Sequence, residues 1–530
     1  MTTALALAIL MSAPPVHYEG LGAYHRPVSS SSVEAQRYFD EGLAFLYGFN
    51  KGQARLNFLE AARLDPNCVM AYWGVAMADG PDINNPYVGP NEAKEAVECL
   101  AKAEDAKPTG AEKELIQAAK ARFQSPPPKD RAPLNAAFAS RMRAVWQHFP
   151  KDPDVGAVFA ESMMDLHPWA LWHRDATPEE GTLEVLDTLR SVLKRSPKHP
   201  LALHMFIHAT EGGPHPEWAE ESANMLLHLQ PGISHMVHMP SHTYVRVGRW
   251  QDAIDSNTAA IKANLVGHAK YGDLGLNDPY GRHNQEMLAY AAMMTGQRKL
   301  AVTAIDRMFT SYSGEKLATM AAEVDGYTPM TLEVRVRFGM WDEILATPET
   351  AESYPIARAV RHYARGLAFA AKGDIQSAVS EQTEFESASK EANAGEVGLN
   401  SGKSIMEICR HMLAGEIQLA KGEMGEAVRE LTAAVEAEDN LNYDEPPDWI
   451  MPTRHALGAV LVKAGRYKDA EAIYRSDLQK LPNNGWSLYG LAKALQGQKK
   501  AAESKAQLAK FHKTWARSDT PIVSSCMCVK

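Results

Sequence analysis

Histidine is concentrated in one stretch of this sequence. Eight of the 19 histidines lie between His199 and His242, where an even spread along 530 residues would place fewer than two. Imidazole is the commonest protein ligand for transition metals, and two imidazoles four residues apart on a helix can reach the same ion. Three groups follow helical spacing: His204, His208 and Glu211 at i, i+4 and i+7; His235, His238 and His242 at i, i+3 and i+7; His283, Glu286 and Tyr290 at i, i+3 and i+7.

Residues at these spacings lie along one side of a helix, so each group predicts a polar stripe. Packed helices lie about 8–10 Å apart, which lets imidazoles from neighbouring stripes converge on one or two ions. The sequence therefore predicts a transition-metal site with six histidine ligands: His204, His208, His235, His238, His242 and His283.

The donor set limits the metal and the reaction. Imidazoles without a nearby cysteine suit copper, zinc or iron, and copper is favoured because it heads the affinity order. With copper we expect oxidative chemistry on a small molecule or peptide; with zinc we expect hydrolysis, with Glu211 or Glu286 as the base. The predicted catalytic residues are Glu211, Glu286, Tyr290 and Arg246, of which Arg246 would pair with an anionic substrate group or form a surface ion pair.

Two alternatives stand beside the metal site. A single buried histidine is usually structural, and we expect this of His148, His362, His411 and His512. A polar groove can also serve as a non-catalytic peptide-binding or protein-binding scaffold, although such grooves favour Lys, Arg and Asn.

Pro240 interrupts the second stripe. A proline inside a helix kinks it, whereas a proline in the first turn marks where the helix begins. In the second case His235 and His238 would lie on a preceding turn, and His242 would be the safest ligand of the three.

A second motif is Asp444–Trp449, with the sequence DEPPDW. Its two prolines predict a rigid extended loop between helices. Such a loop is either a spacer that sets the angle of one hairpin or a binding loop, in which case Glu445 and Trp449 would contact the substrate.

The elements that carry these residues follow a repeat. Between Glu41 and Pro66, small and large residues alternate as in a pair of short packed helices that ends at a proline. Similar phasing recurs in residues 219–231, 241–260, 366–378, 415–434 and 458–482. Glycines such as Gly248 and Gly465 would supply the turns. Because each hairpin can bury its apolar face only against its neighbours, we predict one continuous all-α stack.

This spacing resembles the tetratricopeptide-repeat family. The stretches LAFLYGFN (Leu43–Asn50), AYWGVAMA (Ala71–Ala78), HMPSHTYVRVGR (His238–Arg249) and DEPPDW further resemble a bacterial group of such proteins. The resemblance implies a right-handed superhelical solenoid over residues 33–515. The pairs His204/His208 and His238/His242 are 34 residues apart, one repeat length, and the resemblance implies that such positions face the concave groove.

The termini and the composition set further limits. A net charge of −10 gives no basic surface for nucleic acid, and the longest apolar stretch near the start, Ala4–Met11, is too short to span a membrane. We expect residues 1–32 to be an extended arm or a degenerate export signal, although the scattered cysteines favour the cytoplasm. Residues 516–530 form a tail whose Cys526 and Cys528 would bind Cu(I), be redox active or simply fray.

Overall fold

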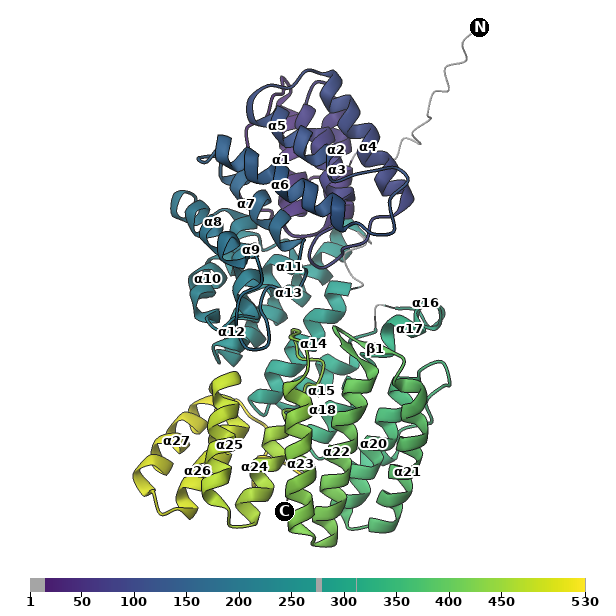
Figure 1. Cartoon of the computed structure of the whole chain (residues 1–530), viewed down its shortest axis with the longest axis vertical. Coiled ribbons are helices and arrows are strands. Elements are labelled where there is room, and N and C mark those ends of the chain that lie inside the picture. Colours follow the sequence, from purple (N-terminus) through teal and green to yellow (C-terminus); the bar gives the residue numbers. More distant parts are fainter. Residues whose placement is uncertain (1–14, 273–278, 311, 530) are drawn as a thin grey trace.

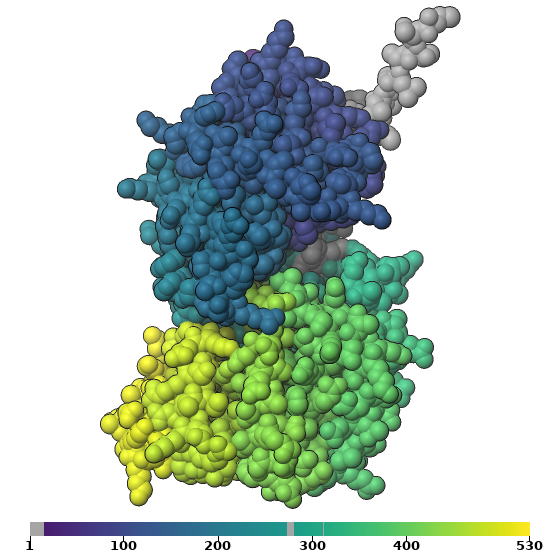
Figure 2. All heavy atoms as spheres, viewed as in Figure 1, coloured from purple at the N-terminus to yellow at the C-terminus, as the bar shows by residue number. Residues whose placement is uncertain are grey.

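The computed structural model describes residues 15–272, 279–310 and 312–529. Their helices pack as antiparallel hairpins in chain order, and the chain is an all-α solenoid of the tetratricopeptide type, as the sequence predicts. Figure 1 shows the first hairpins at one end of the molecule and α20–α27 at the other, with α14 and α15 between them. Figure 2 shows these two parts in contact across the middle.

The helices that lead up to and include the histidine stretch are α1 (Val33–Tyr47), α2 (Lys51–Leu64), α3 (Val69–Asp79), α4 (Pro90–Asp105), α5 (Gly110–Lys120), α6 (Ala132–His148), α7 (Pro153–Met164), α8 (Thr182–Arg195), α9 (Pro200–Glu211), η1 (Pro216–Ala219), α10 (Glu220–Leu229), α11 (Ser234–His238), α12 (Pro240–Arg246), α13 (Trp250–Tyr271), α14 (Pro279–Met294) and α15 (Arg298–Asp306).

The remaining elements are α16 (Gly314–Thr319), α17 (Ala321–Val324), α18 (Met330–Arg337), α19 (Trp341–Leu345), α20 (Pro355–Lys372), α21 (Ile375–Ala392), β1 (Glu396–Val397), β2 (Asn400–Ser401), α22 (Gly402–Lys421), α23 (Met424–Asp439), α24 (Thr453–Lys463), α25 (Tyr467–Lys480), α26 (Gly485–Gly497) and α27 (Ala501–Thr514). The two strands pair antiparallel as a short hairpin.

The small residues of the repeat are explained by the rings they face. Phe58 of α2 is fully buried between Gly42 of α1 and Gly74 of α3, and a Cβ atom at either glycine would lie 2.7 or 2.6 Å from its ring. Tyr474 of α25 lies in the same way between Gly458 and Gly490. Only glycine lets the helices approach this closely, so each ring fills the space between two neighbouring hairpins.

The solenoid curls back on itself. The indole of Trp486 in α26 donates to the carbonyl of Met293 at 2.8 Å, and that of Trp250 in α13 donates to the carbonyl of Pro482 at 2.8 Å. Gly248 turns with φ of 75°, and a Cβ there would lie 2.3 Å from the Pro482 carbonyl. The last hairpins therefore pack against the middle ones.

Both terminal segments are packed in their described parts. Before α1, the chain pairs with the segment after α10, where Gly232 donates to the carbonyl of Gly20 at 2.8 Å. After α27, Ser525 donates to the carbonyl of His455 at 2.8 Å, and a disulfide joins Cys526 to Cys528. The tail is therefore not frayed. The apolar stretch Ala4–Met11 lies outside the described residues.

Within the described residues, no helix is both long enough and apolar enough to cross a lipid bilayer.

Candidate metal centre

The three predicted stripes lie on the first helices of successive hairpins: α9 pairs with α10, α11 and α12 with α13, and α14 with α15. The start of α9 is fixed locally, since Pro200 occupies the first turn and the His199 ring accepts from the backbone N–H of Ala202 at 3.2 Å. His199 is thus a helix cap that positions the first stripe.

Pro240 occupies the first turn of α12, and the chain stays helical through Met239, whose φ and ψ are −49° and −37°. Both alternatives for Pro240 therefore apply in part. It lies at the start of a new helix, and the backbone stays helical through it. His238 and His242 remain one turn apart, and their Nε2 atoms are 2.8 Å apart. His235, one turn earlier on α11, points to a different set of partners.

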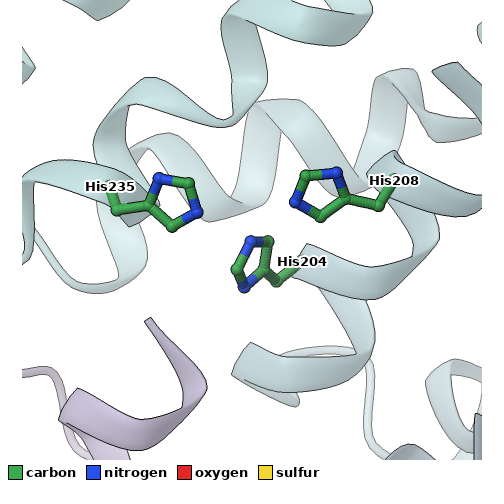
Figure 3. Close-up of side chains that lie close together, drawn as sticks. All are labelled: His204, His208 and His235. Atoms are coloured by element: carbon green, nitrogen blue, oxygen red, sulfur yellow. The ribbon is translucent and has the colours of Figure 1, made fainter. Parts of the chain in front are cut away.

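The structure brings His204, His208 and His235 together, here named triad 1 (Figure 3). One ring nitrogen from each lies within 4.8 Å of the others. His204 donates from Nδ1 to the carbonyl of Tyr47 at 2.8 Å, and His208 donates from Nδ1 to Oε1 of Glu211 at 2.8 Å. Because both acceptors take the Nδ1 proton, the Nε2 atoms of these two rings carry free lone pairs.

The other three imidazoles, His238, His242 and His283, form triad 2. His238 Nδ1 lies 2.6 Å from Oδ1 of Asn257, whose own amide donates to the carbonyl of Ala253. His242 Nδ1 donates to Oε2 of Glu211 at 2.6 Å. The Nε2 atoms face one another, with His242 2.8 Å from His238 and 3.4 Å from His283.

Glu211 links the two triads. One oxygen accepts from His208 of triad 1 and the other from His242 of triad 2. Burial alone would raise its pKa, but the two imidazoles outweigh burial and lower the pKa of Glu211 to about 2. Glu211 is therefore ionised and both its oxygens are occupied, so it orients two imidazoles rather than serving as the free base that the sequence suggested.

Four of the six ring nitrogens of triad 1 are buried without a hydrogen-bond partner among the described residues. Among the described residues, no group pairs with Nε2 of His204 or His208 or with either nitrogen of His235. Each unpaired buried nitrogen costs about 1–3 kcal/mol. In triad 2, a proton shared between the Nε2 atoms of His238 and His242 would form a hydrogen bond between the two rings. In triad 1, no proton donor among the described residues pairs with the free nitrogens.

Burial also sets the charge of the rings. Desolvation, reinforced by the neighbouring imidazoles, lowers the pKa of His204, His235 and His238 well below its ordinary value. These rings are therefore neutral, which is the form that binds metals.

The predicted ligands are largely withdrawn from solvent. Five of the six rings are buried, and His283 is half-buried. Beside the triads lies a cavity of about 610 Å³, lined by residues from both halves of the chain. Its wall includes two rings from each triad: His208, His235, His242 and His283.

Two further predicted residues line this cavity. Glu286 accepts from Arg282 at 2.6 Å and lies 3.6 Å from Nδ1 of His283, so it orients that ring. Burial raises its pKa, but Arg282 and His283 outweigh burial and hold the pKa of Glu286 below its ordinary value. Glu445 accepts from the hydroxyl of Tyr443 at 2.5 Å through Oε1, while its buried Oε2 has no partner within the described part of the chain.

Six predicted residues do not line the cavity: His204, His238 and Glu211 of the histidine cluster, and Trp449, Tyr290 and Arg246. Trp449 is 1% exposed and its ring packs edge-on against Tyr363, so it anchors the loop. Tyr290 is buried edge-on to Trp250.

Of the two contacts expected of Arg246, the surface ion pair is not formed among the described residues. Its guanidinium donates to the carbonyl of Gly213 at 3.2 Å and lies 5.4 Å from the centre of the Tyr443 ring. It therefore braces the loop that presents Glu445.

Sequence spacing missed three residues that hold the rings. Phe49 has φ of 59°, in the left-handed region, and its ring stacks 5.8 Å from His235 and 6.3 Å from His208. Tyr47 supplies the carbonyl that holds His204, and its hydroxyl donates to Asp154. Asn257 holds His238. The strained backbone of Phe49 is a feature often found at functional sites, but only the structure reveals it.

The histidines expected to be structural include three with glutamate partners. His148, His362 and His411 each pair with a glutamate of a neighbouring helix. His455, which is buried, lies 2.9 Å from Arg337 and 3.1 Å from Asp477. These rings have structural partners, unlike those of triad 1.

No protein-family model and no curated protein sequence matches this chain. Among solved structures, the human IFIT1 dimer with m7Gppp-AAAA is similar at 12% identity over 92% of this chain and 91% of that chain, with a TM-score of 0.31. The TPR domain of P58(IPK) is similar at 11% identity over 88% and 99% of the two chains, with a TM-score of 0.23.

The APC/C hetero-tetramer Cut9–Hcn1 is similar at 13% identity over 92% and 95% of the two chains, with a TM-score of 0.26. These low identities and TM-scores support no statement about ligands. The fold assignment rests on the hairpins themselves, and the chemistry of the centre has to be argued from its own residues.

Proposed function

We propose that this chain is a dinuclear metalloenzyme, with copper the favoured metal, that oxidises a small molecule or peptide bound in the cavity. The observation that carries the proposal is triad 1, in which three buried imidazoles converge with unpaired nitrogens. A cation between them would satisfy those lone pairs at once. Two ligands of one tetrahedral ion lie about 3.3 Å apart for metal–nitrogen bonds of about 2.0–2.1 Å, close to the separations in triad 2.

The number of ions follows from the grouping. Each triad supplies three imidazoles, and the linking Glu211 carries one negative charge between them. Three protein ligands leave a coordination position open, which is the pattern of catalytic rather than purely structural sites. Copper in such positions would supply electron exchange with dioxygen, with the substrate losing two electrons and two protons and dioxygen being reduced to hydrogen peroxide.

The protein's own part in that reaction is positioning and proton transfer. Phe49 and Trp169 lie over the triad 1 rings at the cavity wall and limit the access of water. Glu286 and Asn257 fix the orientation of two rings of triad 2. Glu445, with one buried oxygen free at the cavity, is the residue that would accept a proton from bound substrate.

The rival function is the peptide-binding scaffold. A scaffold binds through many shallow contacts spread along a groove, whereas here the polar groups converge on one cavity. The zinc-dependent hydrolase is also less well supported, because the oxygens of Glu211 and Glu286 are already engaged by neighbouring side chains.

Element analysis of protein purified without an affinity tag tests the proposal. We expect close to two copper ions per chain after dialysis, and a rise in unfolding free energy of about 2.7 kcal/mol for each bound ion when free copper is 100 times its dissociation constant. Oxygen uptake with release of peroxide would follow when substrate is added. Protein that holds no metal, and whose melting temperature ignores added Cu²⁺ and Zn²⁺, would refute the metal site.

A positioning residue gives a second test. Asn257→Ala removes the acceptor that holds Nδ1 of His238, so copper affinity at triad 2 should fall about 10- to 100-fold while triad 1 keeps its ion. Competition with a chelator of known affinity measures both sites. The control is Asn440→Ala, an exposed asparagine at the end of α23. Equal affinities in both variants would mean that Asn257 does not orient a ligand.

A further inference from the structure

The wall of the cavity carries more carboxyl groups than basic side chains. Its two cationic side chains each have a carboxylate partner: Lys51 lies 2.6 Å from Asp82, and Arg282 lies 2.6 Å from Glu286. Three other carboxyl groups on its wall, Asp444, Glu445 and Asp448, come from the loop between α23 and α24. Within the part of the chain that the structure describes, no ion pair to a basic side chain is formed by these three.

The loop groups are buried and only partly satisfied. Asp448 accepts from the amide of Asn400 at 2.7 Å and from the backbone of Leu399 at 3.1 Å. Glu445 is 3% exposed, and its Oε2 is unpaired at the cavity wall. A buried carboxylate without a counter-ion is costly unless a cation or a strong donor reaches it.

The rest of the wall is aromatic. Phe49, Trp169, Tyr280 and Tyr327 line the same cavity, between the triads and the loop. Aromatic faces attract cations and cover apolar groups, so carboxylates beside such rings form a pocket for an organic ammonium with an apolar body.

From the unpaired Glu445 oxygen, the surplus of carboxyl groups and the aromatic wall, we infer that the cavity binds a small organic cation, its ammonium group at Glu445 and Asp448 and its apolar body against the rings. This deepens the proposed function, since it names the substrate class of the same site. Asp444 would add a third carboxyl nearby.

The burial of these groups supports the inference. Desolvation raises the pKa of Glu445 to about 7, although His242 and Arg246 oppose the rise. Desolvation likewise raises the pKa of Asp448 to about 6. Both shifts mark sites where negative charge lacks full compensation, which an ammonium group would provide.

The test measures by calorimetry the binding of three probes of similar shape: 2-phenylethylamine, 2-phenylethanol and phenylacetate. The protein is used as purified, and its metal content is recorded. We expect the amine to bind at least about tenfold more tightly than the alcohol and phenylacetate to bind most weakly. N-acetyl-lysine methylamide in a fourth arm distinguishes a free amine from a lysine side chain.

Glu445→Gln should weaken amine binding about tenfold and leave alcohol binding unchanged. The matched control is Glu416→Gln, which alters a buried carboxyl of α22 that does not line this cavity. Equal binding of amine and alcohol to the unaltered protein would overturn the inference, as would absence of binding by all probes. An amine preference in protein that holds no metal would refute the proposed function and leave the inference intact.

Discussion

Replacing His208 and His242 together by alanine is expected to remove both metal ions and to abolish oxygen uptake. The pair takes one imidazole from each triad, and it also removes both partners of Glu211. Each triad is left with two rings, and the remaining carboxylate no longer fixes any ligand. Catalysis should fall by orders of magnitude, because a ligand to the metal acts only through the intact centre.

Metal content after dialysis and oxygen uptake measure this result, and circular dichroism reports whether the helices remain. The control is His455→Ala, which removes an equally buried imidazole from the network with Arg337 and Asp477. That variant should be less stable but keep its copper. The opposite outcome is a double variant that retains as much metal as the unaltered protein but loses its helical structure. In that case the two histidines are structural.

His235→Leu is expected to change stability in opposite directions with and without copper. In the metal-free protein both nitrogens of His235 are buried without a partner in the described chain, so leucine should raise the free energy of unfolding by about 1–3 kcal/mol. In the copper-loaded protein the same change removes a ligand of triad 1. The stabilisation by copper at that triad, about 2.7 kcal/mol at 100 times the dissociation constant, should then be lost.

Urea unfolding with excess copper and with a chelator gives both values. His362→Leu serves as the control, because His362 is partly exposed, pairs with Glu381 at 2.7 Å and lies apart from the triads. Its effect should have the same sign under both conditions. A His235→Leu variant that is destabilised equally with and without copper would show that the imidazole is held by structural contacts.

The helical hairpins were predictable from sequence because the residues that specify each hairpin lie close together along the chain. Phe58 and Tyr474 each lie between two glycines at fixed spacing, and the left-handed turns at Gly248 and Gly465 need glycine whatever surrounds them. The six histidines were predictable for the same reason, since their spacing along single helices is set by the helical period alone.

The grouping of those histidines was not local. The sequence ordered them by helix, yet in the structure His235 joins His204 and His208, while His238 and His242 join His283. The path of the helices past one another decides this, because a ring meets whichever neighbour the packing angle brings across from it. Glu211, assigned by spacing to the first stripe alone, holds a ring from each triad for the same reason.

The cavity was likewise a result of tertiary structure. Contacts such as Trp486 to Met293 join residues nearly 200 positions apart and fold the last hairpins back onto the middle ones. The DEPPDW loop then lies against the triads, with Glu445 at the cavity and Trp449 packed behind it. Local spacing fixed which residues share a helix face, whereas the curvature of the whole solenoid, summed over many interfaces, decided which faces meet.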